Sequence, residues 1–306
     1  MVVIKSINIV SSLDLDKTPI VRFFMKEARS NGLKVTINRM NIKPDVTIFV
    51  GNGIMHRLLF SSYFGRNNIV YWSLESYTGF ENNSKIMWLT RLQYLVNWRR
   101  IILMLPLKER RLEFPIKTKK IIIFKNVPFS CGIKESDWKG KTIDFVHYGE
   151  LDNSRVYTEE ILKLCSSLSK DVLCIGRNAP AGLIMNVKKS TSHNELLEIL
   201  RSSKFGFVGY RPIDFNTRFC APNKMFEMMS MGVIPLISAE NIHLGAFIVD
   251  NRQIVDWTLE ISQLKDQIHD LNQDYLRVSR ECLCLVQSKY NIKTEFGVWF
   301  TSMQVT

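Results

Sequence analysis

The chain has 306 residues, of which 46% are hydrophobic and 23% are charged. These fractions are ordinary for a globular protein and exclude a disordered chain, a collagen or a small disulfide scaffold. A chain of this length can bury a large core without disulfides or structural metals, and its length indicates two domains. The six cysteines include no Cys-x-x-Cys pair, so we expect reduced core residues of a cytoplasmic protein.

The net charge of +12 belongs to the first part of the chain. Residues 1–130 contain 21 Lys and Arg against 8 Asp and Glu, whereas residues 131–306 contain 20 against 21. Such a basic segment indicates a large anionic partner, which could be a membrane surface, an acidic glycan or a nucleic acid. A solvated surface that only maintains solubility is a further alternative. Few aromatic residues are interleaved with the basic ones for base stacking, which disfavours nucleic acid.

In the first 130 residues, short apolar runs alternate with helical patterns. The first helical pattern extends from Ile20 to Asn31, and Gly32 follows as a C-terminal stop. This alternation is typical of a parallel sheet covered by helices. The longest uncharged apolar stretch after the start of the chain, Ile101–Leu107, is far shorter than the roughly 18 residues of a membrane-spanning helix. The predicted strands are Ser6–Val10, Lys34–Ile37, Val46–Val50, Ile69–Trp72, Ile101–Leu105 and Ile121–Phe124.

The same alternation begins again after a polar linker, Cys131–Lys141, and the chain is mostly helical from Asn251 on. The pattern therefore predicts two doubly wound α/β domains in tandem, with a ligand site at the carboxyl ends of the strands. The predicted strands of this half are Asp144–Tyr148, Val172–Ile175, Phe205–Val208 and Val233–Ile237, and the predicted helices are Glu159–Leu168, Asn194–Ser202 and Lys224–Met231.

The segment Ala221–Ser238 has the most informative pattern. Pro222 is typical of the first position of a helix, and Asn223 and Lys224 follow in the first turn. The free N–H groups and positive dipole end of a helix suit a phosphate, and a lysine adds charge. Glu227, one turn on, can accept hydrogen bonds from ribose hydroxyls. The alternative is an ordinary amphipathic helix with a solvent-exposed Lys–Glu pair.

This segment resembles the Pro-Asn-Lys…Glu motif of the retaining, group 1 (family 4-like) glycosyltransferases, which have the GT-B fold. The resemblance implies two Rossmann-like domains facing across a cleft: residues 1–130 for the acceptor and 131–285 for the nucleotide-sugar donor. A C-terminal helical segment, residues 286–306, would cross back to the first domain. Further landmarks similar to the family's, in the family's order, are Ile69–Glu75, Lys125–Pro128, Phe145–Arg155, Val172–Arg177 and Phe205–Tyr210.

The resemblance also implies roles for individual residues. Arg155 and Lys224 would stabilise the charge that develops on the departing diphosphate, and Glu75 is a further catalytic candidate at a strand end. The donor-binding residues would be Gly149, Gly176, Pro222, Asn223, Lys224 and Glu227, and the acceptor side would include Gly51, Asn52 and His56. The five histidines show no metal-ligand spacing, so we expect no metal and no cofactor.

Two positions depart from the family pattern. Phe219 lies eight residues before Glu227, where the family often has a second glutamate. A phenyl ring cannot accept a sugar hydroxyl, so the donor sugar stays open. Glu150 stands where an arginine is frequent, which leaves Arg155 as the basic residue after the glycine turn. Arg177 and Arg218 are alternatives for the missing one.

We therefore expect a glycosyltransferase that moves a sugar from a UDP- or GDP-type donor to a lipid-linked or surface-polysaccharide glycan, with retention and without a metal. It would be cytoplasmic or peripheral at the cytoplasmic membrane face. A non-catalytic subunit that binds nucleotide sugar and a transferase or binder acting on nucleic acid are the alternatives. The candidate membrane contacts are Arg99, Arg100, Lys108, Arg110, Arg111, Lys117, Lys119 and Lys120, with Trp88 and Trp98 at the interface.

Overall fold

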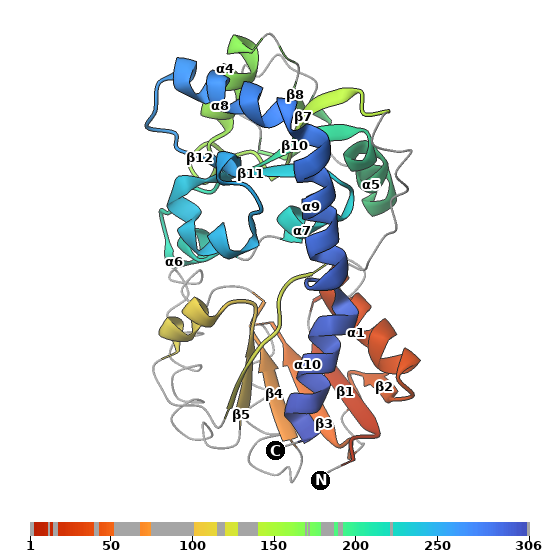
Figure 1. The fold of residues 1–306 in the computed structure, drawn as a ribbon. Helices are drawn as coiled ribbons and strands as arrows, with labels where there is room; N and C mark the ends of the chain where they lie inside the picture. The colour runs from red at the N-terminus through yellow and green to blue at the C-terminus, as the bar shows by residue number, and fades with distance from the viewer. Residues whose placement is uncertain are drawn as a thin grey trace. The chain divides into compact units, whose positions relative to one another are not determined.

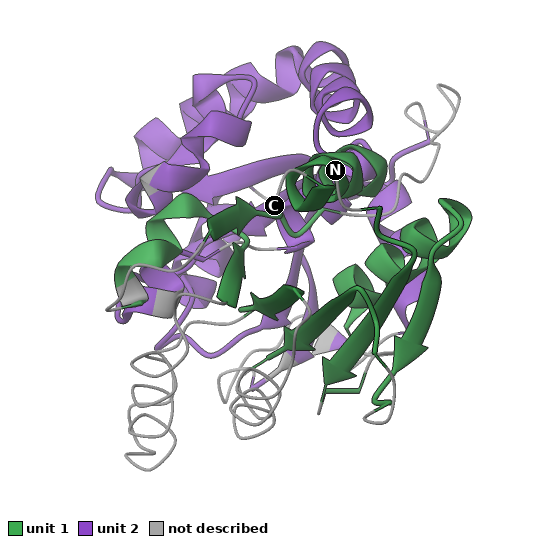
Figure 2. Ribbon diagram, turned by 90° about the horizontal axis from the view of Figure 1, so that it is seen from below, with its two compact units in different colours: residues 1–129, 291–306 green, residues 130–290 purple. Residues whose placement is uncertain are grey.

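The computed structural model describes residues 3–11, 13–14, 18–39, 43–51, 68–74, 101–114, 120–127, 140–168, 170, 172–178, 187–188, 192–220 and 223–304. The chain forms two compact units, each built around a parallel sheet (Figure 1). Unit 1 comprises residues 1–129 and 291–306, and unit 2 comprises residues 130–290 (Figure 2).

The sheet of unit 1 has six parallel strands in the order β2-β1-β3-β4-β5-β6. The strands are β1 (Ser6–Ser11), β2 (Lys34–Ile37), β3 (Val46–Val50), β4 (Asn68–Trp72), β5 (Ile101–Leu105) and β6 (Lys120–Ile123). The central strands are apolar on both faces because helices and loops cover both sides of a parallel sheet. β1 lies between β2 and β3, so the direction of winding reverses between β1 and β3.

One face of this sheet is covered by aromatic packing between two helices from opposite ends of the chain. The ring of Phe24 on α1 makes edge contacts with Trp72, Phe124, Phe296 and Trp299, at centroid distances of 4.9–5.5 Å. Phe296 and Trp299 lie on α10, so the last helix of the chain completes the core of unit 1. The helices of this unit are α1 (Pro19–Ser30), the short 3₁₀ helix η5 (Lys108–Glu113) and α10 (Ile292–Gln304).

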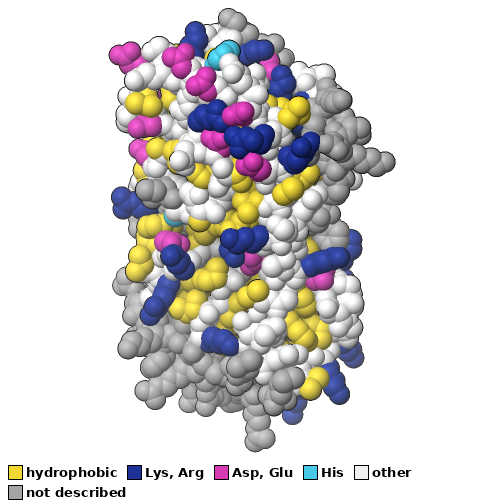
Figure 3. Space-filling model, viewed as in Figure 1, with side chains coloured by type: hydrophobic (Ala, Val, Ile, Leu, Met, Phe, Trp, Pro, Cys, Tyr) yellow, Lys and Arg dark blue, Asp and Glu magenta, His cyan; other side chains and the backbone are white. Residues whose placement is uncertain are grey.

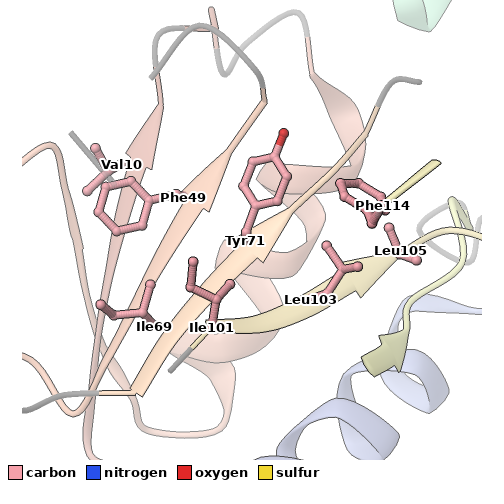
Figure 4. Close-up of a cluster of buried hydrophobic side chains, with 8 residues drawn as sticks. All are labelled: Val10, Phe49, Ile69, Tyr71, Ile101, Leu103, Leu105 and Phe114. Atoms are coloured by element: carbon pink, nitrogen blue, oxygen red, sulfur yellow. The ribbon is translucent and has the colours of Figure 1, made fainter. Parts of the chain in front are cut away.

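The other face of the same sheet carries a second buried cluster, shown in Figure 4. Its members alternate along neighbouring strands, as side chains on one face of a sheet must. They are Val10, Phe49, Ile69, Tyr71, Ile101, Leu103, Leu105 and Phe114.

Buried polar contacts fix α10 and η5 to unit 1. The carboxylate of Glu295, only 3% exposed, accepts hydrogen bonds from the backbone N–H and the Nζ of Lys125, at 3.0 and 2.9 Å. Arg110 is equally buried, and its guanidinium donates to the carbonyl of Leu74 at 3.1 Å. The prediction of Arg110 as a surface membrane contact is therefore wrong: this arginine holds η5 against the end of β4.

The sheet of unit 2 also has six parallel strands, in the order β12-β11-β10-β7-β8-β9. This is the strand order of a Rossmann fold, in which the direction of winding reverses between the first strand, β7, and the fourth, β10. The strands are β7 (Ile143–Glu150), β8 (Val172–Arg177), β9 (Val187–Lys188), β10 (Ser203–Val208), β11 (Ile234–Ser238) and β12 (Ile254–Val255).

Helix α7 lies against β10 and β11 and packs on α9, whereas α4 packs on α8. On the face shown in Figure 3, Lys, Arg, Asp and Glu side chains gather together around α8 and α9, where Asp250 and Asp274 both pair with Arg252 and Arg277. The helices of unit 2 are α4 (Thr158–Ser167), α5 (His193–Arg201), α6 (Phe215–Arg218), α7 (Asn223–Ser230), α8 (Ile261–Gln273), α9 (Tyr275–Ser288) and the 3₁₀ helices η7 (Ala239–Phe247) and η8 (Asn251–Gln253).

The predicted fold class, two doubly wound parallel sheets, is confirmed. Every predicted strand is present, with ends shifted by two residues at most. The sequence pattern missed β9 and β12, because a two-residue strand is too short to show any periodicity. Four of the predicted core cysteines, Cys165, Cys174, Cys220 and Cys282, are buried free thiols.

Candidate functional site

The candidate site lies in unit 2, where β7 and β10 run side by side. Their order in the sheet marks the point at which the direction of winding reverses. In open α/β sheets, such a point leaves a crevice at the carboxyl ends of the strands and is the usual place for a ligand.

Backbone hydrogen bonds join the loops that follow β7 and β10. The N–H of Tyr157 donates to the carbonyl of Gly209 at 3.1 Å, and the N–H of Arg211 donates to the carbonyl of Arg155 at 2.9 Å. Between these bonds, Val156 and Tyr210 form an isolated antiparallel bridge. The bridge fixes the backbone of Arg155 beside Tyr210, although the two residues are far apart in sequence.

Lys224, in the first turn of α7, carries a buried ammonium group. The residue is 7% exposed, and its Nζ lies 4.5 Å from the centre of the Tyr210 ring. Among the described residues, no carboxylate forms an ion pair with this Nζ. Burial lowers the pKa of Lys224 to about 8. Burial, with the Lys224 charge adding to it, also lowers the pKa of His147 to about 3, so that histidine is neutral at pH 7.

Asn223 is the first residue of α7. Its side-chain Oδ1 is buried and has no hydrogen-bond partner in the described part of the chain. The first turn of α7 thus combines backbone N–H groups that have no partner within the helix, a buried cation and an amide oxygen without a partner among the described residues. The first two suit an anion. Pro222, which precedes this turn, lies outside the described residues.

Glu227, one turn further on, faces β7 and α5. The hydroxyl of Tyr148 donates to its Oε2 at 3.1 Å, and the Nδ1 of His193 lies 3.9 Å from its Oε1. The side chain is 13% exposed, and burial raises the pKa of its carboxyl. Because Lys224 is buried and the side chain of Glu227 is only 13% exposed, the alternative of an ordinary helix with a solvent-exposed Lys–Glu pair is wrong.

Arg155 has a half-exposed side chain. Its guanidinium lies 3.7 Å from a carboxylate oxygen of Asp214, and the two side chains are 43% and 39% exposed. An exposed pair at this distance contributes little free energy. The guanidinium can therefore exchange Asp214 for another anion at small cost.

Gly149 and Gly176 are paired across β7 and β8. A Cβ on Gly176 would lie 2.0 Å from the carbonyl oxygen of Gly149, and Gly149 itself has a φ of +104°. A side chain at Gly176 would displace the backbone of Gly149, and a side chain at Gly149 would be strained by its positive φ. β7 and β8 thus pass close together at Gly176, where the Gly149 carbonyl and the Leu151 side chain fill the space of a Cβ, whereas no described atom fills that space at Gly149.

Phe219 is part of an aromatic group at the end of α6. Its ring lies 4.7 Å from that of Phe215 and 5.8 Å from that of His243, centroid to centroid. The Nε2 of His243 lies 2.7 Å from the carbonyl oxygen of Cys220. Phe219, which stands where the resembled family often has a glutamate, thus has aromatic neighbours.

The remaining predicted site residues belong to unit 1 or lie outside the described residues. Gly51 follows β3, has a φ of +79° and donates its N–H to the carbonyl of Trp72 at 3.1 Å. Glu75, Asn52 and His56 lie outside the described residues, as do the candidate membrane contacts Arg99, Arg100, Lys117 and Lys119 and both interface tryptophans, Trp88 and Trp98.

Three residues of the site were missed from the sequence. Tyr148 lies two residues before the end of β7, Tyr210 lies two residues after the end of β10, and His193 begins α5. Each is an aromatic residue at the carboxyl end of a strand or at the start of a helix, which is the signal that could have identified them. Nothing in the sequence pattern showed that they meet α7.

Within the described ranges, no group of three or more His, Cys, Asp or Glu side chains could hold a metal ion. The helices of the described ranges also include none with the length and apolar character needed to cross a bilayer.

Comparison with models of protein families gives no match, and comparison with curated protein sequences gives none either. Solved structures of glycosyltransferases are similar over almost the whole chain. A sucrose-phosphate synthase from Thermosynechococcus elongatus is 10% identical, with a TM-score of 0.68 over 98% of this chain and 99% of that one. An α-glucosyltransferase in complex with UDP and a 13-mer DNA is 9% identical, with a TM-score of 0.65 over 98% and 99%. T4 phage BGT in complex with UDP and Mn²⁺ is 14% identical, with a TM-score of 0.58 over 97% and 99%.

This likeness, together with the strand orders of both sheets, shows that the chain has the two-domain, Rossmann-like GT-B fold. Identities of 9–14% establish the fold alone, so any function has to be argued from the residues of the site.

Proposed function

We propose that this protein is a glycosyltransferase that uses a nucleoside diphosphate sugar, of the UDP or GDP type, as donor. The observation that carries the proposal is the buried ammonium of Lys224 at the first turn of α7, with no carboxylate partner among the described residues. A buried charge is costly unless it is paired. A diphosphate at the carboxyl ends of β7 and β10 would supply the missing partner. Similar structures that contain UDP support the uridine form.

The donor site would work by binding the diphosphate more strongly as its charge grows. Lys224, the N–H groups of α7 and the guanidinium of Arg155 would stabilise the departing diphosphate. Glu227 would bind ribose hydroxyls, and Gly149, where a Cβ would meet no described atom within 4 Å, would allow the nucleotide to approach the backbone. In a retaining, front-face reaction the leaving phosphate accepts the acceptor's proton, so no strong side-chain base is needed. Metal independence is part of this proposal.

Isothermal titration with UDP and GDP tests the donor site. Glu227→Ala should weaken binding by about 1.5–3 kcal/mol, the usual size of a hydrogen bond to a charged group. Glu281→Ala, which removes an exposed carboxylate of α9, is the matched control and should leave binding unchanged. A screen of nucleotide sugars for hydrolysis, with and without EDTA, would identify the donor and test metal independence. A wild-type protein that binds no nucleoside diphosphate would overturn the proposal.

We further propose a lipid-linked or surface glycan at the cytoplasmic membrane face as the acceptor. Unit 1 carries all of the excess positive charge, with 22 Lys and Arg against 9 Asp and Glu, whereas unit 2 has 19 against 20. An enzyme with a small neutral acceptor would gain nothing from this unequal distribution of charge between the two units. An enzyme that extends a glycan anchored in an anionic bilayer would gain attraction to its substrate.

Nucleic acid is the second candidate acceptor. Besides the basic unit 1, it is favoured by two similar structures: the α-glucosyltransferase in complex with DNA, and a β-glucosyltransferase described as a DNA-modifying enzyme. Binding to a DNA duplex that persists at physiological salt would favour this acceptor, because purely phosphate-driven binding weakens steeply with salt.

A non-catalytic nucleotide-sugar-binding subunit is the alternative to an enzyme, and the aromatic surroundings of Phe219 favour it. Binding of UDP or GDP without turnover of any donor in the hydrolysis screen would support the subunit. Turnover of one donor would exclude it.

A further inference from the structure

We propose that Tyr148 is a positioning residue that holds the Glu227 carboxylate for the ribose of the donor, so that the site selects ribonucleotides over deoxyribonucleotides. The inference rests on the proposed function of unit 2 as a nucleotide-sugar site. It assigns the selection to a residue that does not itself touch the nucleotide.

The hydroxyl of Tyr148 bridges two parts of α7. It lies 3.0 Å from the carbonyl oxygen of Lys224 and 3.1 Å from Oε2 of Glu227. Both are acceptors, and a phenol carries one proton, so the two compete for it or share it. The hydroxyl thus ties the carboxylate to the backbone of the helix turn that carries Lys224.

The second carboxylate oxygen is left for a ligand. Oε1 of Glu227 lies 3.9 Å from Nδ1 of His193, which is too far for a hydrogen bond. No hydrogen bond reaches Oε1 from any of the described residues. Because the side chain is 13% exposed, a ribose hydroxyl can still reach this oxygen. With Oε2 held by Tyr148, Oε1 has a fixed direction.

The position of Tyr148 in the sheet keeps its hydroxyl, and therefore the hydrogen bond to Glu227, in a fixed place. Tyr148 lies on β7, which is paired with β10 on one side and β8 on the other, and the residue is 6% exposed. Burial raises the pKa of its phenol far above 10, so the hydroxyl keeps its proton at any working pH. A carboxylate held in place before the nucleotide arrives loses less conformational freedom on binding.

The test compares UDP with 2′-deoxy-UDP and 3′-deoxy-UDP by isothermal titration. Tyr148→Phe removes only the hydroxyl. Tyr275→Phe is the matched control, because Tyr275 is buried in the same unit and its hydroxyl donates to the carbonyl of Gly232 at 3.2 Å. A second variant, Glu227→Gln, is measured alone and combined with Tyr148→Phe.

We expect Tyr148→Phe to weaken UDP binding about tenfold and to change binding of the deoxy analogue that lacks the contacted hydroxyl by less than twofold. Tyr275→Phe should leave the preference for UDP over that analogue intact, and Tyr148→Phe should add little further loss of affinity in the Glu227→Gln background.

Equal losses of affinity for UDP and both deoxy analogues would mean a general structural effect and overturn the proposal. Wild-type protein that binds UDP and both analogues equally would also overturn it, while the donor site would stand. Wild-type protein that binds no UDP or GDP would overturn the proposed function and this inference with it.

Discussion

The ammonium group of Lys224 lies over the face of the Tyr210 ring, 4.5 Å from its centre. An aromatic face attracts a cation without neutralising its charge. The ammonium can therefore move from the ring to a bound anion without leaving an unpaired charge behind. A carboxylate in the same place would form an ion pair that a diphosphate would have to break. The contact with Tyr210 therefore keeps a buried charge available for a ligand.

The first prediction is that Lys224→Met stabilises the free protein and removes its affinity for UDP. The lysine is buried, and burial lowers its pKa to about 8. An apolar side chain of similar length should raise the free energy of unfolding at pH 7 by about 1–3 kcal/mol. Urea unfolding without ligand measures the gain, and calorimetry with UDP measures the loss.

The same substitution should change how stability depends on pH. The folded-state pKa of Lys224 is below the unfolded value of about 10.5, so the unfolded chain binds more protons between pH 8 and pH 10.5. The free energy of unfolding of the unmodified protein should gain a rising contribution with pH across this window, which Lys224→Met should lack. Parallel curves for the two proteins would show that the pKa of Lys224 is not lowered in the folded state.

The second prediction concerns UDP affinity against pH. Below about pH 8 the ammonium of Lys224 is charged in the free protein, and above it the charge is lost. Affinity should therefore fall by up to tenfold per pH unit above pH 8, with uptake of one proton on binding. Burial raises the pKa of both Tyr148 and Tyr210, so these groups stay protonated over this range. Calorimetry in buffers of different ionisation enthalpy measures the proton uptake, and uptake that does not rise between pH 7 and pH 9 would contradict this prediction.

Much of the fold could be predicted because its strands are continuous apolar runs. The ends of β2, β3 and β5 follow directly from the sequence. The Rossmann strand order and the packing of α10 against Phe24 could not be predicted in this way, because periodicity reports which face of an element is buried and not which element covers it.

The motif placed Lys224 and Glu227 in one helix turn, and this part of the site could be predicted. Their partners could not, since Tyr148 lies 76 residues before Lys224 and meets it only through the pairing of β7 with β10. For Arg110, in contrast, the sequence pattern predicted a surface contact that is wrong. Its basic neighbours Lys108 and Arg111 indicate a solvated surface, yet its side chain turns inward to the carbonyl of Leu74.

The third prediction assigns Arg155 to the departing diphosphate. If its guanidinium leaves Asp214 to bind the growing charge, Arg155→Ala should lower kcat by about 10²–10³ and raise KM much less. Arg201→Ala is the control, because Arg201 has a similar exposed fraction and pairs with Glu198 at 2.9 Å. A loss confined to KM would mean that Arg155 only anchors the ground state.

The last prediction concerns the basic surface of unit 1, whose exposed residues include Lys108 and Arg111 on η5. Leu112, which directly follows Arg111 in η5, is 75% exposed. Each basic residue near an anionic bilayer contributes about 1 kcal/mol, and the attraction decays within a Debye length. Flotation with vesicles that contain anionic lipid should recover the protein at low salt and release it at high salt.

Lys108→Gln combined with Arg111→Gln should reduce this recovery and leave UDP binding unchanged. Lys163→Gln combined with Lys289→Gln makes the same change of charge on exposed residues of unit 2 and is the matched control. Arg110 is kept, because its loss would leave the buried carbonyl of Leu74 without this donor. If the unmodified protein ignores anionic vesicles at low salt but retains a DNA duplex at physiological salt, the membrane acceptor is wrong and the nucleic-acid acceptor replaces it. Equal losses in both double variants would mean that net charge, and not the surface of unit 1, drives the binding.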